Sequence, residues 1–582
     1  MLAIAASCLP VAAQMTVSLS PSQPSPAPLG TVVTWNASVW PAQHGTLSYR
    51  FRTRLLGTGF RTVVDYGPKS SFDWATIARE GPYEIEVSAQ NNDTGEIVSA
   101  TSFYRLESLA LSRLSIVTPT RYPQVFIYSA SPCPTGQRMK VEFRSDEVSS
   151  TPFKACHTGV SMNFYLAGMR ANTVYYAHYI LDTGSELIPG PEAAFATGYV
   201  PLKPPDVSLL TNGSLPTTNG ILLQSLFGTA SIATDLQGNV IWFSPGDITF
   251  LTRPVDGGTF LGIGENEFLD PSKQFMREFD LAGNTVAETN AARINQQLTA
   301  LNVHPINAFH HEARKLPNGS YLVLANSERM LTDVQGPGAV DVVGDTILIL
   351  NPDLQVIWAW DAFDHIDPHL KAVQGETCVH PSGAACAPWY LAPKANDWLH
   401  GNSLQLTPDG DILYSIRHLD WVVKIDYKNG FGTNNILWRL GKNGDFQTNS
   451  TDPFPWFSHQ HDPNFAADNT TLTIFDDGNA RRLTNTKANS RGQVWQIAEP
   501  TRTANLLVNA DLGAYSAAVG SAQKLPNGNY HFDSGFIFDP VHPGAFLSQS
   551  VEVDPAGKIL YNIQFTGMEY RTFRMGTLYT AP

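Results

Sequence analysis

Short runs in which apolar and polar residues alternate dominate the first 200 residues of the chain. Between residues 14 and 108 these runs read TVVTWNASVW, LSYRFRTRL and YEIEVSAQN. Strict alternation over a few residues is typical of a half-buried antiparallel strand, and Gly- or Pro-containing turns separate the runs. The pattern predicts a small Ig-like β-sandwich over residues 14–108.

A second unit of the same kind follows over residues 109–198. Its segment MRANTVYY resembles the signature of fibronectin type III modules, with Ala171 where that module usually has proline. This resemblance predicts a second, fibronectin type III-like β-sandwich. The segment YVPLKPPDVSLL then reads as a proline-stiffened linker to the rest of the chain.

From residue 205 onward, two kinds of segment alternate. One is a turn followed by a strand, as in KLPNGSYLVLA and QLTPDGDILYSI, and the other is a second hairpin, as in NPDLQVIWAWD and DPAGKILYNIQF. The pair recurs about six times, about 60 residues apart, and each unit is too small to bury both faces of a sheet alone. The chain is therefore predicted to be all-β, with two N-terminal β-sandwiches followed by a six-bladed β-propeller over residues 205–582. A pair of large β-sandwiches is the alternative, but it does not explain the regular pairing of the two segments.

The net charge of the chain limits the classes of partner that it can bind. Its 582 residues carry a formal net charge of -14, whereas binding to nucleic acid or to an anionic membrane needs a basic face. No nucleic-acid partner is therefore expected. After the N-terminus no run of about 20 apolar residues occurs, so we expect no membrane span either.

The N-terminal segment and the cysteines both indicate export. Residues 1–13 are apolar or small and predict a signal peptide cleaved before Gln14, although no basic residue precedes the apolar run; a plain N-terminal strand is the alternative. The cysteines beyond that segment form two local pairs, Cys133 with Cys156 and Cys378 with Cys386. An even number of cysteines in local pairs predicts disulfides and a periplasmic or secreted protein, the alternative being four buried thiols. The spacings do not match a zinc site.

The histidines are concentrated in the predicted propeller. Three of the 15 precede residue 300, while His310 and His311, His400, and His459 and His461 each stand a few residues before the turn of a repeat. A single loop histidine is usually a satisfied structural group. Three groups in the same register of successive blades would converge on the propeller axis, so we expect them to share one pocket.

Strand geometry selects among these side chains. Neighbours in a strand point to opposite faces, so only one of His310 and His311 faces the pocket. We expect it to be His311, because His311-Glu312 aligns with His461-Asp462 when both are counted from the following strand. His459 either reaches the pocket or supports His461. Arg417 stands at the far end of the strand after the next turn, so we expect it to return to the same end of the blade as His400. His418 is expected to point away from Arg417.

Two chemistries suit several histidines around one pocket. A metal site would use three histidines and a carboxylate such as Asp462, but HExxH is absent and Arg417 would repel a cation. Transfer of an anionic group fits better. Guanidinium and imidazole N–H groups complement oxygens that gain charge, and a neutral imidazole, favoured by a nearby arginine, can attack the transferred group.

Several motifs together resemble a known family. The segments DWLHGNS (397–403), SIRH (415–418), QH (460–461) and FDDGNAR (475–481), with the paired histidines before LPNG, are similar to the bacterial arylsulfotransferases that use no PAPS. The resemblance implies ping-pong transfer of a sulfuryl group from a phenolic sulfate ester to another phenol. His461 would form a transient sulfohistidine, and His311, His400 and Arg417 would hold the sulfuryl oxygens. No cofactor and no metal are implied, which agrees with the absence of a phosphate-binding GxxxxGK[ST] loop.

The resemblance also suggests secondary roles. Substrate binding is expected from five further residues: His310, His459, Asn402, Trp398 and Trp456. For the two tryptophans, packing inside a blade is an equal alternative. The family carries a structural disulfide, for which Cys378–Cys386 is a candidate, and a single N-terminal sandwich where two are expected here. The extra domains are candidates for forming a homodimer or for attachment.

Two other functions stay open on the sequence. A secreted propeller with Ig-like modules also suits a binding or adhesion protein without catalysis. A hydrolase or lyase on the same propeller, metal-dependent in one version, is the other alternative. Arg417 at its distance after His400 is the feature that most favours sulfuryl transfer.

Overall fold

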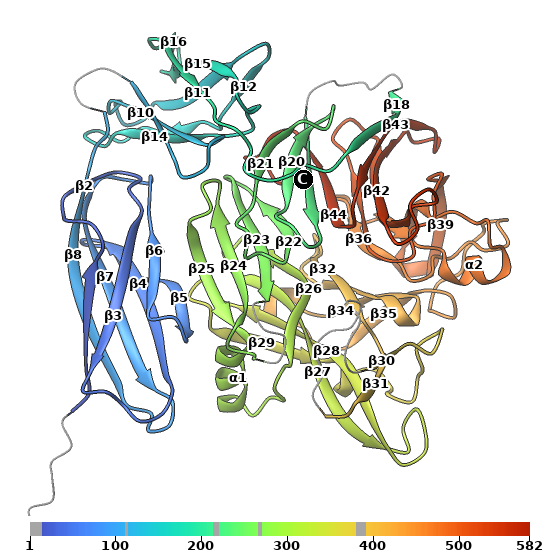
Figure 1. The fold of residues 1–582 in the computed structure, drawn as a ribbon. Coiled ribbons are helices and arrows are strands. Elements are labelled where there is room, and N and C mark those ends of the chain that lie inside the picture. The colour runs from blue at the N-terminus through green and yellow to red at the C-terminus, as the bar shows by residue number, and fades with distance from the viewer. Residues whose placement is uncertain (1–13, 111–114, 213–219, 266–269, 380–390) are drawn as a thin grey trace, which may run out of the picture. The chain divides into compact units, whose positions relative to one another are not determined.

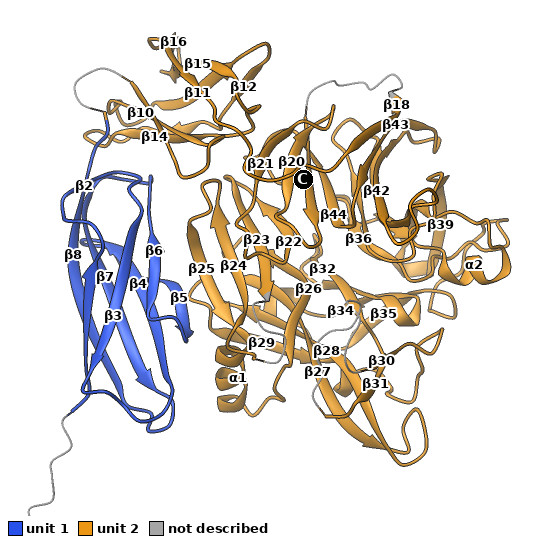
Figure 2. Ribbon diagram, viewed as in Figure 1, with its two compact units in different colours: residues 1–109 blue, residues 110–582 orange. Residues whose placement is uncertain are grey.

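The computed structural model describes residues 14–110, 115–212, 220–265, 270–379 and 391–582. The predicted signal peptide and Cys386 lie outside the described residues. The chain divides into two compact units, residues 1–109 and residues 110–582 (Figure 2). Strands dominate both units, and the described α-helices are α1 (Ala291–Ala300) and α2 (Asn479–Thr484), so the predicted all-β class is confirmed. Among the described helices, none has the length and apolar character needed to cross a membrane.

The first unit is a sandwich of two sheets with strand orders β1-β3-β6 and β2-β8-β7-β4-β5. Alternating residues of its strands point inward, so that Trp35, Phe51, Ile85 and Val87 are fully buried. Trp35 packs edge-on against Tyr104, with 5.6 Å between the ring centroids. The strands are β1 (Thr16–Pro21), β2 (Ala27–Pro28), β3 (Val33–Trp40), β4 (Leu47–Leu55), β5 (Arg61–Gly67), β6 (Ser71–Trp74), β7 (Gly81–Asn91) and β8 (Ile97–Glu107).

A second, smaller sandwich opens the second unit. Its sheets are β14-β10-β9 and β12-β11-β15-β16, with β13 on β11 and β17 on β15. The predicted disulfide between Cys133 and Cys156 is present in its core. Cys378, in the later region, is also disulfide-bonded. The strands are β9 (Ile116–Pro119), β10 (Phe126–Ala130), β11 (Arg138–Arg144), β12 (Val148–Ser150), β13 (Lys154–Ala155), β14 (Met162–Leu166), β15 (Val174–Asp182), β16 (Leu187–Pro189) and β17 (Ala193–Ala196).

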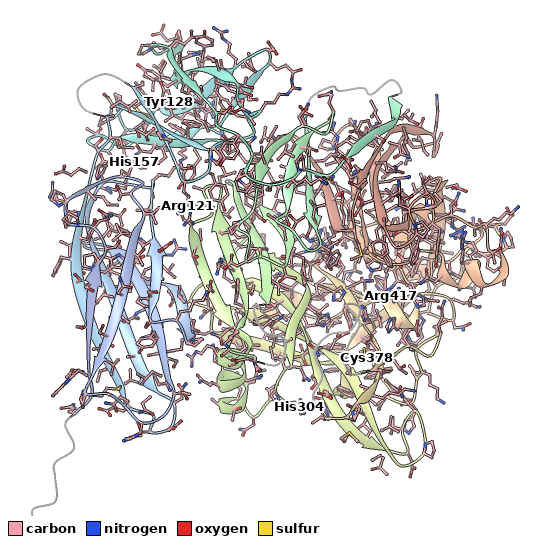
Figure 3. The ribbon with its side chains drawn as sticks, in the orientation of Figure 1. Arg121, Tyr128, His157, His304, Cys378 and Arg417 are labelled. Carbon is pink, nitrogen blue, oxygen red and sulfur yellow. A yellow bond between two sulfur atoms is a disulfide. The ribbon has the colours of Figure 1, made fainter. Side chains whose placement is uncertain are left out.

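This sandwich is tied to the sheets that follow it. Arg121, labelled in Figure 3, donates from Nε to the carbonyl of Ala282 at 3.1 Å. The Tyr165 hydroxyl donates to the Asp280 carboxylate at 2.9 Å. Tyr122 also belongs to the same hydrophobic core as residues of the next sheets. These contacts explain why residues 110–582 form one compact unit rather than two.

Six sheets follow in the described residues between Val207 and Met575, each built from consecutive strands. The first sheet contains β19 (Ile221–Leu226), β20 (Ile232–Asp235), β21 (Val240–Phe243) and the final β44 (Glu569–Met575), and the second contains β22 (Phe250–Val255), β23 (Thr259–Glu265), β24 (Gln274–Asp280) and β25 (Thr285–Asn290). The third sheet contains β26 (Ala308–Lys315), β27 (Tyr321–Thr332), β28 (Ala339–Leu350), β29 (Val356–Asp361), β30 (Thr377–Val379) and β31 (Lys394–Asp397), and the fourth contains β32 (Gly401–Leu406), β33 (Ile412–Ile416), β34 (Trp421–Ile425) and β35 (Ile436–Gly441). The fifth sheet contains β36 (His461–Phe465), β37 (Thr471–Asp476), β38 (Arg491–Ala498) and β39 (Thr503–Asp511), and the sixth contains β40 (Gly520–Lys524), β41 (Tyr530–Phe538), β42 (Phe546–Val553), β43 (Ile559–Thr566) and β18 (Val207–Asn212).

One edge strand of each sheet lies against the edge strand of the next. We call β22, β26, β32, β36, β40 and β44 the inner strands; successive members contact one another from β22 to β44, and the labelled ones gather in the middle of the six sheets in Figure 1. Because β44 pairs with β19, the end of the chain and the start of this region share one sheet. A six-bladed propeller stays a prediction, and this arrangement is the observation that supports it.

Large side chains between adjacent sheets hold the inner strands in place. One core joins Trp360 of β29 to Tyr414 of β33, and another joins Trp438 of β35 to Trp495 of β38. All four rings are essentially inaccessible to solvent. Close packing of this kind leaves little room for movement, so the inner strands hold their side chains rigidly in place.

The Cys133–Cys156 disulfide should contribute measurable stability. It joins residues 23 apart, and closing a loop of that size typically stabilises a fold by about 3 kcal/mol. We therefore expect the double variant Cys133→Ala/Cys156→Ala to unfold at a lower urea concentration, followed by circular dichroism. Because the variant lacks this bond, a reductant should lower the wild-type midpoint by more than the variant's. An unchanged midpoint in the double variant would contradict this expectation.

Candidate active site

Three neighbouring inner strands each contribute one histidine to a single cluster. His311 lies in β26, His400 immediately precedes β32, and His461 is the first residue of β36. The ring centroids of His311 and His400 are 4.9 Å apart. Burial lowers the pKa of His311 well below its ordinary value, and the nearby His400, His310 and His461 add to that shift. The structure thus brings together the three histidines that the repeat register selected.

The backbone is irregular where these side chains project. The pairing of β26 with β27 shifts register just after Phe309. The pairing of β32 with β33 shifts after Gly401, and that of β36 with β37 shifts after His461. Positive φ values accompany the shifts, 56° at His311 and 50° at His400. Such bulges re-aim side chains away from strict alternation, and left-handed backbone at a non-glycine residue is strained.

His461 is held in one orientation. Its Nδ1 lies 2.9 Å from Oδ1 of Asp477, and its Nε2 accepts from the backbone N–H of Val519 at 3.2 Å. Burial, reinforced by the nearby Arg417, holds the pKa of His461 well below its ordinary value of 6.5. The ring is therefore neutral at neutral pH, with a proton on Nδ1 and a lone pair on Nε2.

Arg417, labelled in Figure 3, is the cation that, after burial, contributes most to lowering the pKa of His461. It begins the 3₁₀ turn η2 (Arg417–Leu419), and its guanidinium lies 3.7 Å from Oδ2 of Asp477. Burial raises the pKa of Asp477, and Arg417 opposes that rise. The Nε of Arg417 is buried without a hydrogen-bond partner among the described residues. The guanidinium therefore keeps donor capacity for a further anion.

The expectation that His418 points away from Arg417 is wrong. Nε2 of His418 accepts from Nη1 of Arg417 at 2.8 Å, and its ring stacks on that of His400 with 4.6 Å between centroids. Strand alternation does not apply here, because β33 ends at Ile416 and the chain turns into η2. His418 Nδ1 donates to the Asp397 carbonyl at 2.7 Å, which fixes the tautomer that accepts from Arg417.

His310 and His459 lie behind the cluster. Nδ1 of His310 is 2.8 Å from Nδ1 of His311, and its Nε2 is 3.0 Å from Oδ1 of Asp345. Of the adjacent pair, His311 is therefore the one beside His400, as expected. His459 binds the carboxylate of Asp420 at 3.1 Å, and its ring lies 5.7 Å from that of His418. His310 thus contacts a member of the cluster directly, whereas His459 lies beside His418.

The other predicted substrate contacts divide into two groups. Asn402 is fully buried beside the cluster and donates to the Gln460 carbonyl at 2.8 Å. The two tryptophans pack in apolar cores, which is the alternative that the sequence left open. Trp398 contacts Phe363, and Trp456 stacks on Trp495 with 5.0 Å between ring centroids.

A buried ionic network lies directly beneath the imidazoles. Arg253 pairs with Glu312 at 2.7 Å and also with Asp462, the residues that follow His311 and His461. Arg571 pairs with Glu312 at 3.0 Å and donates to the Asn402 carbonyl at 2.6 Å. Burial works to raise the pKa of Asp462, but Arg253 and Arg571 outweigh it and hold that pKa well below its ordinary value.

Sequence reasoning missed several residues of this site. Asp477 stands in the FDDGNAR motif, yet its role as a partner of His461 depends on the turn after β37. Tyr570 and Arg571 come from the last strand; the Tyr570 hydroxyl donates to the His311 carbonyl at 2.7 Å. Their signal was the short motif EYRTFR, which carries two arginines in a strand of an acidic protein.

Two groups of side chains in the described region have the spacing of metal ligands. In each group one donor atom per residue lies within 4.8 Å of the others. Arg417 donates to a histidine that belongs to both groups, and its positive charge disfavours a cation there. The groups are Asp397, His400 and His418, and Glu376, His418 and His459.

This arrangement suits transfer of an anionic group. It combines a neutral imidazole with an oriented lone pair, a guanidinium beside it, and two further imidazoles in reach. Donors that are fixed in place before the reaction stabilise negative charge that develops on oxygen. A neutral histidine is also able to act as a nucleophile.

Comparisons with known proteins agree with this chemistry. The sequence profile of the arylsulfotransferase (ASST) family matches residues 207–573, more than half of the chain. No curated protein matches the sequence.

Two solved structures resemble about a third of the chain each. A two-domain fibronectin type III segment of chicken tenascin is 13% identical, with 31% of this chain and 98% of that chain covered and a TM-score of 0.15. A chain of a cytokine receptor complex is 13% identical, with 32% and 98% covered and a TM-score of 0.13. The family match over the six-sheet region carries the assignment instead. The chain therefore belongs to the arylsulfotransferase (ASST) family, and this membership supports aryl sulfate sulfotransferase activity.

Proposed function

We propose that the protein transfers a sulfuryl group from a phenolic sulfate ester to another phenol through a sulfohistidine at His461, without PAPS. The observation that carries the proposal is the oriented, neutral His461 imidazole beside Arg417. In the proposal the six sheets form a closed six-bladed propeller, with the cluster at one end of its axis. The sulfuryl oxygens would occupy the space between His461 and Arg417.

The first half of the reaction forms a nitrogen–sulfur bond. A substrate sulfur replaces the long 3.2 Å hydrogen bond that Nε2 of His461 accepts from Val519. The Nε2 lone pair then attacks sulfur, the bond from sulfur to the phenolic oxygen breaks, and the phenoxide leaves with the electron pair. As positive charge grows on the ring, the Asp477 carboxyl that accepts from Nδ1 stabilises it.

Neighbouring residues hold the transferred group and the leaving oxygen. Arg417 and His311 donate toward the sulfuryl oxygens, and His400 protonates the departing phenoxide. The carboxylate of Asp397, 2.6 Å from Nδ1 of His400, orients that ring. In the second half, an acceptor phenol returns its proton to His400, and its oxygen attacks sulfur and frees His461.

The location and partners of the protein are part of the same proposal. Disulfides persist mainly in oxidising compartments, so the Cys133–Cys156 bond supports a periplasmic or secreted location. The donor and acceptor are small aryl compounds, and no nucleic acid is required. The N-terminal sandwiches would serve attachment or formation of a homodimer.

Replacing His461 should abolish transfer. His461→Ala removes the nucleophile, so release of 4-nitrophenol from its sulfate in the presence of a phenol acceptor should fall roughly 10³-fold or more. Labelled sulfate should be trapped on the wild type and not on the variant. His369→Ala is the matched control, because the side chain of His369 is 68% exposed. Full activity in His461→Ala would refute the covalent mechanism, and release without an acceptor would favour a hydrolase.

The acid side of the pH profile should report the lowered pKa of His461. Protonation removes the Nε2 lone pair, so activity is lost as the pH falls through the pKa of His461, which lies well below 6.5. The rate of sulfation of the enzyme should therefore show no loss near pH 6.5. Arg417→Gln removes a positive charge that lowers this pKa, so the acid limb should move to higher pH in that variant, in addition to a lower maximal rate. A wild-type loss centred at 6.5 would contradict the assignment.

A further inference from the structure

A cavity of about 800 Å³ lies at the far end of the inner strands from the histidine cluster. His311 and His461 stand near the starts of β26 and β36, whereas the cavity is lined by the ends of these strands and of β40. Arg314, three residues after His311, is one lining residue, and three strand residues span roughly 10 Å. The cavity is therefore distinct from the histidine cluster, because none of the three histidines lines it, although Arg253 and Asp462 of the network beneath the cluster do.

Positive charge exceeds negative charge around this cavity. Its ionisable lining residues are Arg253, Arg314, Lys315 and Lys524 against Asp462 and Asp468. Two of the cations are already committed. Arg253 binds Glu312 and Asp462, and Lys315 binds both oxygens of Glu278 at 2.8 Å. Arg314 and Lys524 are the cations left to consider.

Arg314 supplies the unbalanced charge. Behind the cavity, the guanidinium groups of Arg253, Arg314 and Arg571 face the carboxylates of Glu312 and Asp462. The buried Asp533 carboxyl also interacts with Asp462, but burial raises its pKa well above the ordinary value, so it adds little negative charge. The three cations therefore outnumber the two carboxylates that are paired with them. Burial, together with repulsion from Arg253, lowers the pKa of Arg314 to about 10. An anion beside Arg314 would complete the charge balance.

The donors of Arg314 are incompletely used. Its Nη2 donates to Oδ1 of Asn464 at 2.7 Å, but its nearest contact with Glu312 is 3.5 Å long. That contact is made by Nε, which is buried and forms no hydrogen bond within the described residues, and Nη2 also lies 3.6 Å from Oδ1 of Asp462. A guanidinium is planar and presents paired donors that match the oxygens of sulfate or phosphate.

Lys524 stands at the more exposed edge of the same cavity. Its side chain is 37% exposed, and its distance to the Asp468 carboxylate is 3.6 Å, too long for a firm hydrogen bond. Its flexible ammonium is free to turn toward a ligand bound at Arg314. Together the two side chains provide an inner and an outer contact for one anion.

We propose that this cavity binds a tetrahedral oxyanion, either free or carried on a small organic group, with Arg314 as the inner contact and Lys524 as the outer one. The volume exceeds what an inorganic ion needs and is typical of sites for small organic ligands. The ligand is thus a sulfate or phosphate, free or as an ester. Because Arg253 lines the cavity and also binds Asp462, the occupant would contact the ionic network next to His461.

The test is the number of anion sites that depend on each arginine. Equilibrium dialysis with labelled sulfate should find two sites on the full chain, of which Arg417→Ala removes one and Arg314→Met removes the other. If the proposed function is wrong, the wild type should lack the sulfate site that depends on Arg417. The Arg314-dependent site stays, so the two failures are distinguishable.

A second variant guards against misfolding of Arg314→Met. Lys524→Glu changes an exposed side chain, and we expect it to weaken the Arg314-dependent site about tenfold with an unchanged circular dichroism spectrum. Lys558→Glu, at an exposed turn residue outside the lining, should have no effect. Unchanged sulfate binding in both Arg314→Met and Lys524→Glu would overturn the proposal.

Three probes distinguish the sources of the oxyanion. Sulfate, phosphate and 4-nitrophenyl sulfate are compared on His461→Ala, which does not consume the ester in the proposed mechanism. Tighter binding of the ester at the Arg314-dependent site supports an organic occupant, and tighter binding of sulfate or phosphate supports a free ion. Failure of all three probes to depend on Arg314 would contradict the site.

Discussion

The structure of the candidate site depends on the pairing of charges buried beneath it. Glu312 and Asp462 are almost completely inaccessible, and both bind Arg253. A buried charge without a partner is costly, and removal of one partner from such a pair typically destabilises a protein by about 3–5 kcal/mol. The two carboxylates follow His311 and His461 directly in the sequence. Their pairing with a single guanidinium therefore fixes β26 and β36 relative to β22, and with them the two imidazoles.

The bulges direct side chains of otherwise regular strands into the candidate site. In an undisturbed strand, a histidine and the next carboxylate would point to opposite faces. Left-handed backbone at His311 and Asp462 lets the imidazole join the cluster while the carboxylate reaches the network below. Such backbone is strained, and the packed cores between the sheets supply the rigidity that maintains it. The cluster is thus prepared before any substrate arrives, which is what electrostatic stabilisation of a reaction requires.

The sequence predicted the parts of the site that repeat and missed those that do not. The register of the repeats located His311, His400 and His461, and alignment of the following carboxylates chose His311 over His310. His418 was misassigned because alternation holds only inside a strand, and β33 ends at Ile416. Asp477 and Arg571 meet the cluster through turns and pairings between segments distant in sequence, which no local pattern records. The tryptophans near the motifs are core residues, since an aromatic side chain suits a ligand and a core equally. The all-β class followed from alternation and turn residues, whereas the docking of the second sandwich rests on tertiary contacts such as that of Tyr165 with Asp280.

The pairing of β44 with β19 has a consequence for how the protein comes into being. Arg571 and Tyr570, on the last strand, reach the backbone of Asn402 and His311 in the middle of the region. A chain is made from its N-terminus, and domains fold as units while synthesis proceeds. Here the ribosome must have made the chain through β44 before that strand can take its place beside β19. The candidate site is therefore complete only once β44 has been made, and a chain that stops before β44 lacks both this strand and the Arg571 that supports the site.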